Sequence, residues 1–172
     1  MELLERFALG DLEAFEALFR QFQNEVYRWI VRIVRDPAAA EDLTVETFWR
    51  IYRAHARFRP EGSFGAWARR ISSNVAIDHL KRARREVALE MDPPGPSKPD
   101  AAIQQETRQK IARAFAGLSP RLRAAATLAL IEEEPYEQIA EGLGISVGGV
   151  KTRVARAVRK LQESLREQGV EP

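Results

Sequence analysis

Apolar residues recur every three or four positions along most of the chain, which is the spacing of one face of an α-helix. The pattern is clear from residue 12 to residue 35 and again from residue 65 to residue 85, and it returns in shorter stretches after residue 100. No stretch shows the strict alternation of apolar and polar residues that is typical of a half-buried strand. The sequence therefore predicts an all-α protein.

Two helix starts can be recognised in the first third of the chain. Asp11 precedes a pattern that ends near Arg35, and Asp36-Pro37 combines an N-cap carboxylate with proline at the first helical position. The helix after Pro37 buries Leu43 and leaves an acidic edge exposed on its other side. This edge is either solvated surface or a docking face for a basic partner helix, and helix geometry alone does not separate the two.

Residues 136–161 predict a helix-turn-helix: a short amphipathic helix, a turn that contains Gly144, and a second helix capped by Ser146. Four apolar residues at helical spacing form the buried stripe of the second helix: Val150, Val154, Val158 and Leu161. From Gly148 to Lys160 the chain carries five cations and no acid. Because ordinary surface helices mix both signs, this favours DNA binding over the alternative of a solvated helix that closes a bundle.

The start of a recognition helix is where side chains meet base edges in the major groove. The candidates for that contact are Lys151, Thr152, Arg153, Ala155 and Arg156. Arg159 and Lys160 lie further along the helix, where phosphates are the better-placed targets.

The stretch from residue 54 to residue 64 interrupts the helical pattern, because Pro60 and Gly62 are turn formers. Aromatic residues in this loop precede a helix rich in arginine and amide side chains. Aromatic rings and cations together are suited to holding unpaired bases. The alternative is that the rings are core residues, which is the better interpretation for Phe64 and Trp67, while Phe58 stays open.

The stretch after residue 86 contains four prolines, Pro93, Pro94, Pro96 and Pro99, and is acidic. Such a segment is expected to be a stiff linker rather than a helix or a central strand. The prediction is two small helical domains, residues 1–86 and 101–172, joined by a Pro-rich acidic linker, residues 87–100. The second domain contains the helix-turn-helix.

Charge and composition narrow the function further. The net charge is only +2, but residues 79–85 and 148–160 are strongly basic and residues 86–106 hold five acids against one lysine. Two separate basic patches favour two nucleic-acid contacts. The acid run Glu132–Glu134 is expected to be a solvated corner, with a role in partner binding as the lesser alternative.

An enzyme is disfavoured, because His55 and His79 stand alone, the chain has no cysteine, and no glycine-rich phosphate loop precedes a helix. We expect no catalytic residue, no metal site and no cofactor. With no apolar run of eighteen residues and no signal-peptide pattern at the N-terminus, the chain is expected in the cytoplasm without membrane insertion.

Three blocks of sequence together resemble the extracytoplasmic-function group of the sigma-70 family of RNA polymerase sigma factors. They are residues 36–52 (DPAAAEDLTVETFWRIY), residues 58–78 with FRPEGSFGAW and the later Asn74, and residues 136–156. The resemblance implies that the first domain binds the β′ clamp helices of core RNA polymerase and holds the melted minus-10 element. It implies that the second domain reads the minus-35 element and meets the β flap, and that an anti-sigma factor controls the protein.

Carried over by position, the resemblance implies three groups of contact residues. Core polymerase would meet Glu41, Asp42, Glu46, Thr47 and Arg50. The minus-10 strand would meet Arg57, Phe58, Arg59, Phe64, Arg70 and Asn74. The minus-35 groove would meet the five candidates of the recognition helix named above.

Two positions depart from the family pattern. Val45 stands where glutamine is usual, which puts one polar contact to the clamp in doubt, and Gly149 stands where threonine is common. The alternative function is a dimeric helix-turn-helix regulator that does not bind polymerase. The promoter sequence, the inducing signal and the identity of an inhibitor are not readable from these residues.

Overall fold

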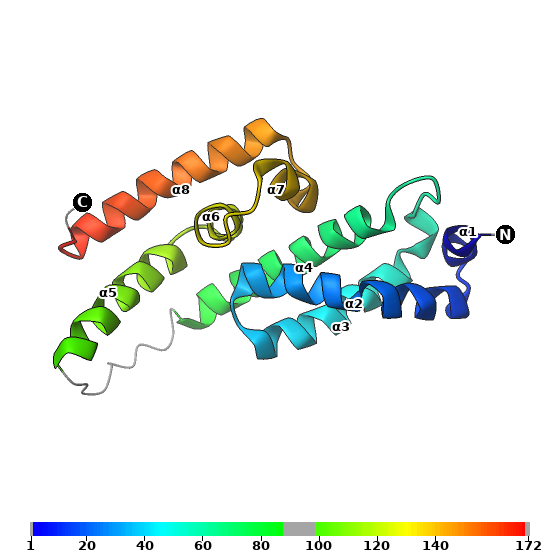
Figure 1. Ribbon diagram of the computed structural model, residues 1–172, viewed down its shortest axis with the longest axis horizontal. Coiled ribbons are helices and arrows are strands. Elements are labelled where there is room, and N and C mark those ends of the chain that lie inside the picture. The colour runs from blue at the N-terminus through cyan, green and yellow to red at the C-terminus, as the bar shows by residue number, and fades with distance from the viewer. Residues whose placement is uncertain (1, 88–98, 171–172) are drawn as a thin grey trace.

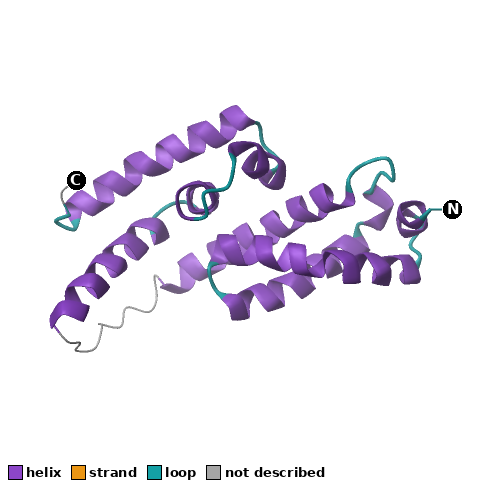
Figure 2. Ribbon diagram, viewed as in Figure 1, coloured by secondary structure: helices purple, strands orange, loops and turns teal. Residues whose placement is uncertain are grey.

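The structure is a computed structural model that describes residues 2–87 and 99–170 (Figure 1). The described residues form helices and connecting turns and contain no strand, which confirms the all-α prediction (Figure 2). The elements in order are α1 (Leu3–Ala8), α2 (Leu12–Val34), α3 (Pro37–Arg53), η1 (His55–Arg57), α4 (Phe64–Val87), α5 (Pro99–Ala116), α6 (Pro120–Ala126), η2 (Thr127–Ile131), α7 (Tyr136–Leu143) and α8 (Val147–Glu167).

In the N-terminal half, α2, α3 and α4 pack against one another, and the short α1 lies across the start of α2 (Figure 1). The cap predicted at Asp36 is present, and Asp11 also caps its helix. The Asp11 carboxylate accepts the backbone N–H groups of Glu13 and Ala14, and the Asp36 carboxylate accepts that of Ala39. Arg35, in the left-handed region at φ 56°, ends α2, so only one further residue separates the two long helices.

An aromatic cluster closes the end of this half where the loop after η1 meets α1. The ring of Phe7 lies 5.7 Å from that of Phe58 and 5.5 Å from that of Phe64, measured between centroids. The rings of Trp67 and Phe58 are tilted relative to each other, with their centroids 5.1 Å apart. Edge-to-face and tilted ring pairs at these distances are favourable, so the loop is held by its own aromatic residues.

In the C-terminal half, α7 and α8 form the predicted helix-turn-helix. Gly144, in the left-handed region at φ 69°, ends α7, and the Ser146 hydroxyl caps α8 by accepting the backbone N–H of Gly149 at 3.0 Å. Of the predicted stripe, Val150, Val154 and Leu161 are buried and Val158 is half-buried. Ala157 is also buried, which the spacing did not predict.

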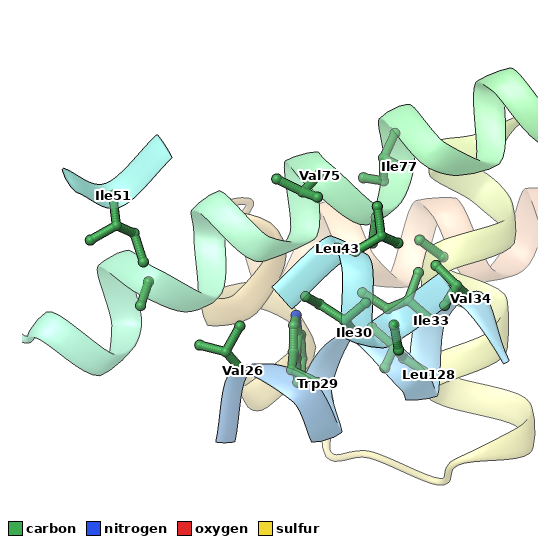
Figure 3. Packing of buried hydrophobic residues seen from close by; sticks show 14 of the residues in the cluster. Val26, Trp29, Ile30, Ile33, Val34, Leu43, Ile51, Val75, Ile77 and Leu128 are labelled. Atoms are coloured by element: carbon green, nitrogen blue, oxygen red, sulfur yellow. The ribbon is translucent and has the colours of Figure 1, made fainter. Parts of the chain in front are cut away.

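The helix after Pro120 is not α-helical throughout. It loosens into a π-helical turn over Thr127–Ile131, in which the backbone N–H of Glu132 donates to Thr127 O at 3.1 Å. Leu118 and Leu128 are buried, whereas Ile131 faces solvent. The wider turn redirects the chain, and Leu128 from this turn packs beside Ile30 and Ile33 of α2 (Figure 3).

The two halves share one hydrophobic core. Buried residues of α2, α3 and α4 and buried residues of α6, η2, α7 and α8 belong to the same cluster. Figure 3 shows part of it, where Leu128 of η2 meets residues of α2. A smaller second cluster joins α5 to α8 through Ala114, Leu118, Ala157 and Leu161. The domain boundaries stay predictions: most of the expected linker, residues 88–98, lies outside the described residues, and α5 begins at Pro99.

The cap at Asp36 gives a test of the local fold. Asp36→Ala removes the acceptor for the Ala39 N–H and is expected to lower the free energy of unfolding by about 1 kcal/mol. Asp36→Asn keeps an oxygen acceptor and serves as the control, with a change of a few tenths of a kcal/mol at most. Urea denaturation measures both, and equal losses in the two variants would contradict a role for the cap.

The cap at Asp11 predicts a dependence of stability on pH. A hydrogen bond from Arg6, at 2.7 Å, and then the backbone N–H of Ala14 hold the pKa of the Asp11 carboxyl below its ordinary value. Because the folded pKa is the lower one, the stabilisation is fully present above the unfolded pKa, about 3.9, and is lost as the pH falls through the folded pKa. Asp11→Asn keeps a capping oxygen without the charge. The difference in urea midpoint between wild type and this variant should shrink below about pH 4. A difference that stays constant with pH would contradict a contribution of the Asp11 charge to stability.

Candidate nucleic-acid and polymerase interfaces

The outer face of α8 carries exposed cations at the positions that the sequence predicted. Lys151, Thr152, Ala155 and Arg156 are exposed, as are Arg159 and Lys160 one turn later. The Thr152 hydroxyl donates to Gly148 O at 3.0 Å, a bond within the helix. These side chains form an uninterrupted surface that a nucleic-acid groove can approach.

Arg153 is the exception among the five recognition-helix candidates, because it is only half-exposed. Burial, followed by the nearby cation of Arg121, lowers its pKa. Its guanidinium is therefore directed toward the body of the helix-turn-helix domain more than toward the face formed by Lys151 and Arg156.

The residues predicted to contact the minus-10 strand fall into an exposed group and a buried group. Arg57, Arg59, Arg70 and Asn74 are exposed. Phe58 and Phe64 are 5% and 3% exposed and lie in the aromatic cluster around Phe7. In this conformation the two rings are core residues, and the cations and the amide are the groups that can reach a DNA strand.

The acidic edge of α3 is largely free. Glu41 and Asp42 are exposed, while Glu46 and Asp78 both receive hydrogen bonds from Arg50, at 2.7 and 3.2 Å. Thr47 is fully buried and its hydroxyl donates to Leu43 O at 2.7 Å, so this residue supports the helix from inside and does not reach a partner.

Two large apolar side chains lie beside this edge, in a groove that the sequence pattern did not predict. Val45 is 68% and Trp49 is 59% exposed. They line a groove of about 430 Å³ between α2 and α3, together with Leu12, Phe15, Glu16, Phe19, Phe48 and Tyr52. An exposed apolar groove flanked by carboxylates is typical of a protein-binding surface.

The acid run before α7 is not a solvated corner. Glu134 forms an ion pair with Arg32 of α2, and Glu132 forms one with Arg35 at the end of the same helix. The sequence interpretation was wrong here because the partners are about a hundred positions away in the chain. The sequence also did not predict that Arg69 joins distant parts of the chain. Its guanidinium donates hydrogen bonds to Glu25 and to Gln138.

The described residues contain no cluster of three or more side chains that could hold a metal ion. Within the same residues, no helix has the length and apolar character needed to cross a membrane.

Comparison with known families locates both halves of the chain. The family described as Sigma-70 region 2 matches residues 18–86, and the family described as Sigma-70, region 4 matches residues 108–161.

Among characterised relatives, RNA polymerase sigma factor CarQ of Myxococcus xanthus is 33% identical over 168 residues, covering 95% of this chain and 96% of CarQ. ECF RNA polymerase sigma factor BldN of Streptomyces coelicolor is 35% identical over 172 residues, covering 96% of this chain. The chain spans 65% of the length of BldN.

Two solved structures share the fold. CnrH, in complex with the cytosolic domain of CnrY, superposes with a TM-score of 0.56 at 24% identity over 96% of each chain. The sigma factor RpoE of Bartonella quintana, in complex with the anti-sigma factor NepR, superposes with a TM-score of 0.52 at 23% identity, covering 90% of this chain and 98% of RpoE. With both family regions matched in order and a relative such as CarQ aligned over nearly its whole length, the chain belongs to the extracytoplasmic-function group of the sigma-70 family of RNA polymerase sigma factors.

Proposed function

We propose that the chain binds core RNA polymerase and directs transcription initiation from promoters that it recognises through minus-10 and minus-35 elements. The observation that carries this proposal is the exposed face of α8, where Lys151, Arg156, Arg159 and Lys160 follow a Ser146 cap with no acid among them. A helix N-terminus with this arrangement is suited to the major groove.

The docking face for core polymerase in this proposal is the α3 edge. Glu41, Asp42 and Glu46 supply negative charge, and Val45 and Trp49 supply apolar surface next to it. A partner helix with basic and apolar side chains complements both features, since charge steers the encounter and apolar burial stabilises the complex. Val45, which departs from the family pattern, makes this contact more apolar.

The minus-10 contact is assigned to Arg57, Arg59, Arg70 and Asn74, which are exposed. Opening about ten base pairs costs on the order of 14 kcal/mol at about 1.4 kcal/mol per stacking step. Two or three captured bases return only about 1–3 kcal/mol each. The protein alone therefore does not melt DNA, and it captures bases after core polymerase has positioned the duplex.

The proposal makes the protein a non-catalytic initiation factor that acts in the cytoplasm, where its polymerase and promoters are. The support for a non-catalytic role is the family, whose members are initiation factors, together with the protein-binding and DNA-binding faces described above. The match to both family regions, in order along the chain, supports this function over the alternative of a dimeric regulator.

An anti-sigma factor is part of the proposal. RpoE of Bartonella quintana was solved bound to the anti-sigma factor NepR, and this chain shares its fold. The identity of the inhibitor is not implied by that likeness.

The polymerase contact is tested by charge reversal. Asp42→Arg places a cation in an exposed acidic edge and is expected to weaken binding to core polymerase at least tenfold, because like charges then face each other. Glu163→Arg makes the same change at an exposed site on α8 and should bind core normally. Co-elution on a sizing column and fluorescence titration measure both. Equal affinities of the two variants for core polymerase would contradict the assignment of this contact to the α3 edge. If the wild type formed no complex with core polymerase, the proposed function itself would be wrong.

The promoter contact is tested with the holoenzyme. Arg156→Ala is expected to lower affinity for a selected promoter fragment by about 1–3 kcal/mol and to relax sequence preference within the minus-35 element. Arg166→Ala, an exposed cation near the end of the same helix, is the control and should leave the preference unchanged. Run-off transcription from a promoter library reads out both effects. A uniform loss across all minus-35 sequences would reassign Arg156 to a phosphate contact.

A further inference from the structure

A cavity of about 290 Å³ lies between the C-terminal end of α2, helices α5 and α6, and the turn η2. In the described part of the chain its lining consists of five apolar residues, one threonine and three arginines, without an acid. None of these residues belongs to the polymerase or promoter contacts assigned above. Cavities that bind small molecules are lined mainly by apolar side chains, with a few polar groups that orient the ligand. This cavity is therefore a candidate ligand site.

The apolar wall of the cavity contains both buried and exposed side chains. Ile33 of α2 is 1% exposed, and Phe115 of α5 is half-buried. Ile111 of α5 and Ile131 of η2 are large and apolar, yet each is 42% exposed. Covering such side chains removes apolar surface from water, which stabilises a bound apolar group. The wall is thus suited to an apolar ligand or to the apolar part of a larger one.

A π-helical turn forms one side of the cavity. Thr127 and Ile131, the first and last residues of η2, both line it. Turns of this kind are rare within α-helices and occur frequently at functional sites. The turn is a second feature, independent of the lining composition, that points to a ligand at this place.

The three arginines of the cavity differ in how their charge is balanced. Arg35 forms an ion pair with Glu132, so its charge is offset within the protein. Arg108 is exposed and can be solvated by water. Arg123 of α6 is half-buried, and within residues 2–87 and 99–170 its guanidinium has no carboxylate partner.

Arg123 is the group that an anionic ligand would satisfy. Burial lowers the pKa of its guanidinium, and no carboxylate in the part of the chain described by the structure opposes that shift. Burying a charge without a partner is unfavourable, and an anion in the cavity would remove part of that cost. The planar guanidinium matches a carboxylate through two parallel hydrogen bonds. We therefore expect the ligand to place a carboxylate on Arg123.

The volume and the charge of the cavity limit the ligand further. At about 30 Å³ for each water-sized group, the cavity holds roughly ten non-hydrogen atoms. One negative charge balances Arg123, whereas a phosphate ester would bring about 1.5 to 2. We propose that the cavity binds an amphipathic carboxylate, with its carboxylate on Arg123 and a medium-length apolar chain against Ile33 and Phe115. This proposal does not depend on the function proposed above, because it concerns a separate site and its test needs neither polymerase nor promoter.

Octanoate is the probe for this site, because its size matches the estimated capacity of the cavity. Isothermal titration calorimetry on the full chain should show saturable binding of octanoate. Acetate has the charge without the chain, and octylammonium has the same chain with the opposite charge. Both should bind at least about tenfold more weakly than octanoate, since each lacks one of the two features that the cavity recognises.

Substitution of Arg123 tests the head-group contact. Arg123→Met keeps an apolar side chain of similar length and is expected to weaken octanoate binding by about tenfold or more. Arg123→Lys keeps the charge without the planar fork and should bind with intermediate affinity. Arg121→Met is the matched control, because Arg121 is an exposed cation on the same helix that does not line the cavity. This variant should bind octanoate as the wild type does.

A second variant covers the case in which Arg123→Met does not fold. Ala112→Phe adds a ring at an exposed lining position of α5 and should block octanoate by filling the cavity. Arg113→Phe adds the same ring at the next position, which is exposed and does not line the cavity, and should leave binding unchanged. NMR spectra of isoleucine methyl groups locate the ligand. Octanoate should shift the resonances of Ile111 and Ile131 but not that of Ile103, which lies on α5 outside the cavity.

Three results would overturn the proposal. Absence of saturable octanoate binding by the wild type means that the cavity does not take this class of ligand. Equal affinities for octanoate and octylammonium mean that Arg123 does not select an anion. Methyl shifts at Ile103 without shifts at Ile111 and Ile131 mean that octanoate binds elsewhere on the chain.

Discussion

The indole of Trp29 packs against the bare backbone at Gly142, and the position of the helix-turn-helix domain depends on that contact. Around it, Ser73 joins the two helices that meet there, and Arg32 and Arg69 cross from one half of the chain to the other. The apolar clusters of both halves merge at this point into one core. The glycine at position 142 of α7 thus determines how closely the two family regions approach each other.

Each functional surface lies outside this core and keeps its own geometry. The α3 edge and its apolar groove occupy one face, and the cations of α8 project from another helix. Because the recognition helix is held within its own half by Val150, Val154, Ala157 and Leu161, its cationic face would survive separation of the halves.

Several polar groups at the contact between α4 and α7 are only partly satisfied. Ser73 has one proton for two carbonyls, and Arg69 places two of its nitrogens on acceptors while its Nε has none in the described part of the chain. Contacts of this kind specify one geometry and contribute less stability than a purely apolar interface of the same size.

Local pattern was sufficient for the helices, their caps and the helix-turn-helix, because the signals at Asp11, Asp36, Gly144 and Ser146 act within a few residues of each helix end. The same holds for the exposed cations of α8, whose positions follow from helical periodicity. The burial of Phe64 agrees with the sequence interpretation, whereas the burial of Phe58 and Thr47, the ion pairs of Glu132 and Glu134, and the role of Gly142 were decided only by tertiary structure. These depend on side chains brought together from distant parts of the chain, and neither spacing nor composition records which of them meet.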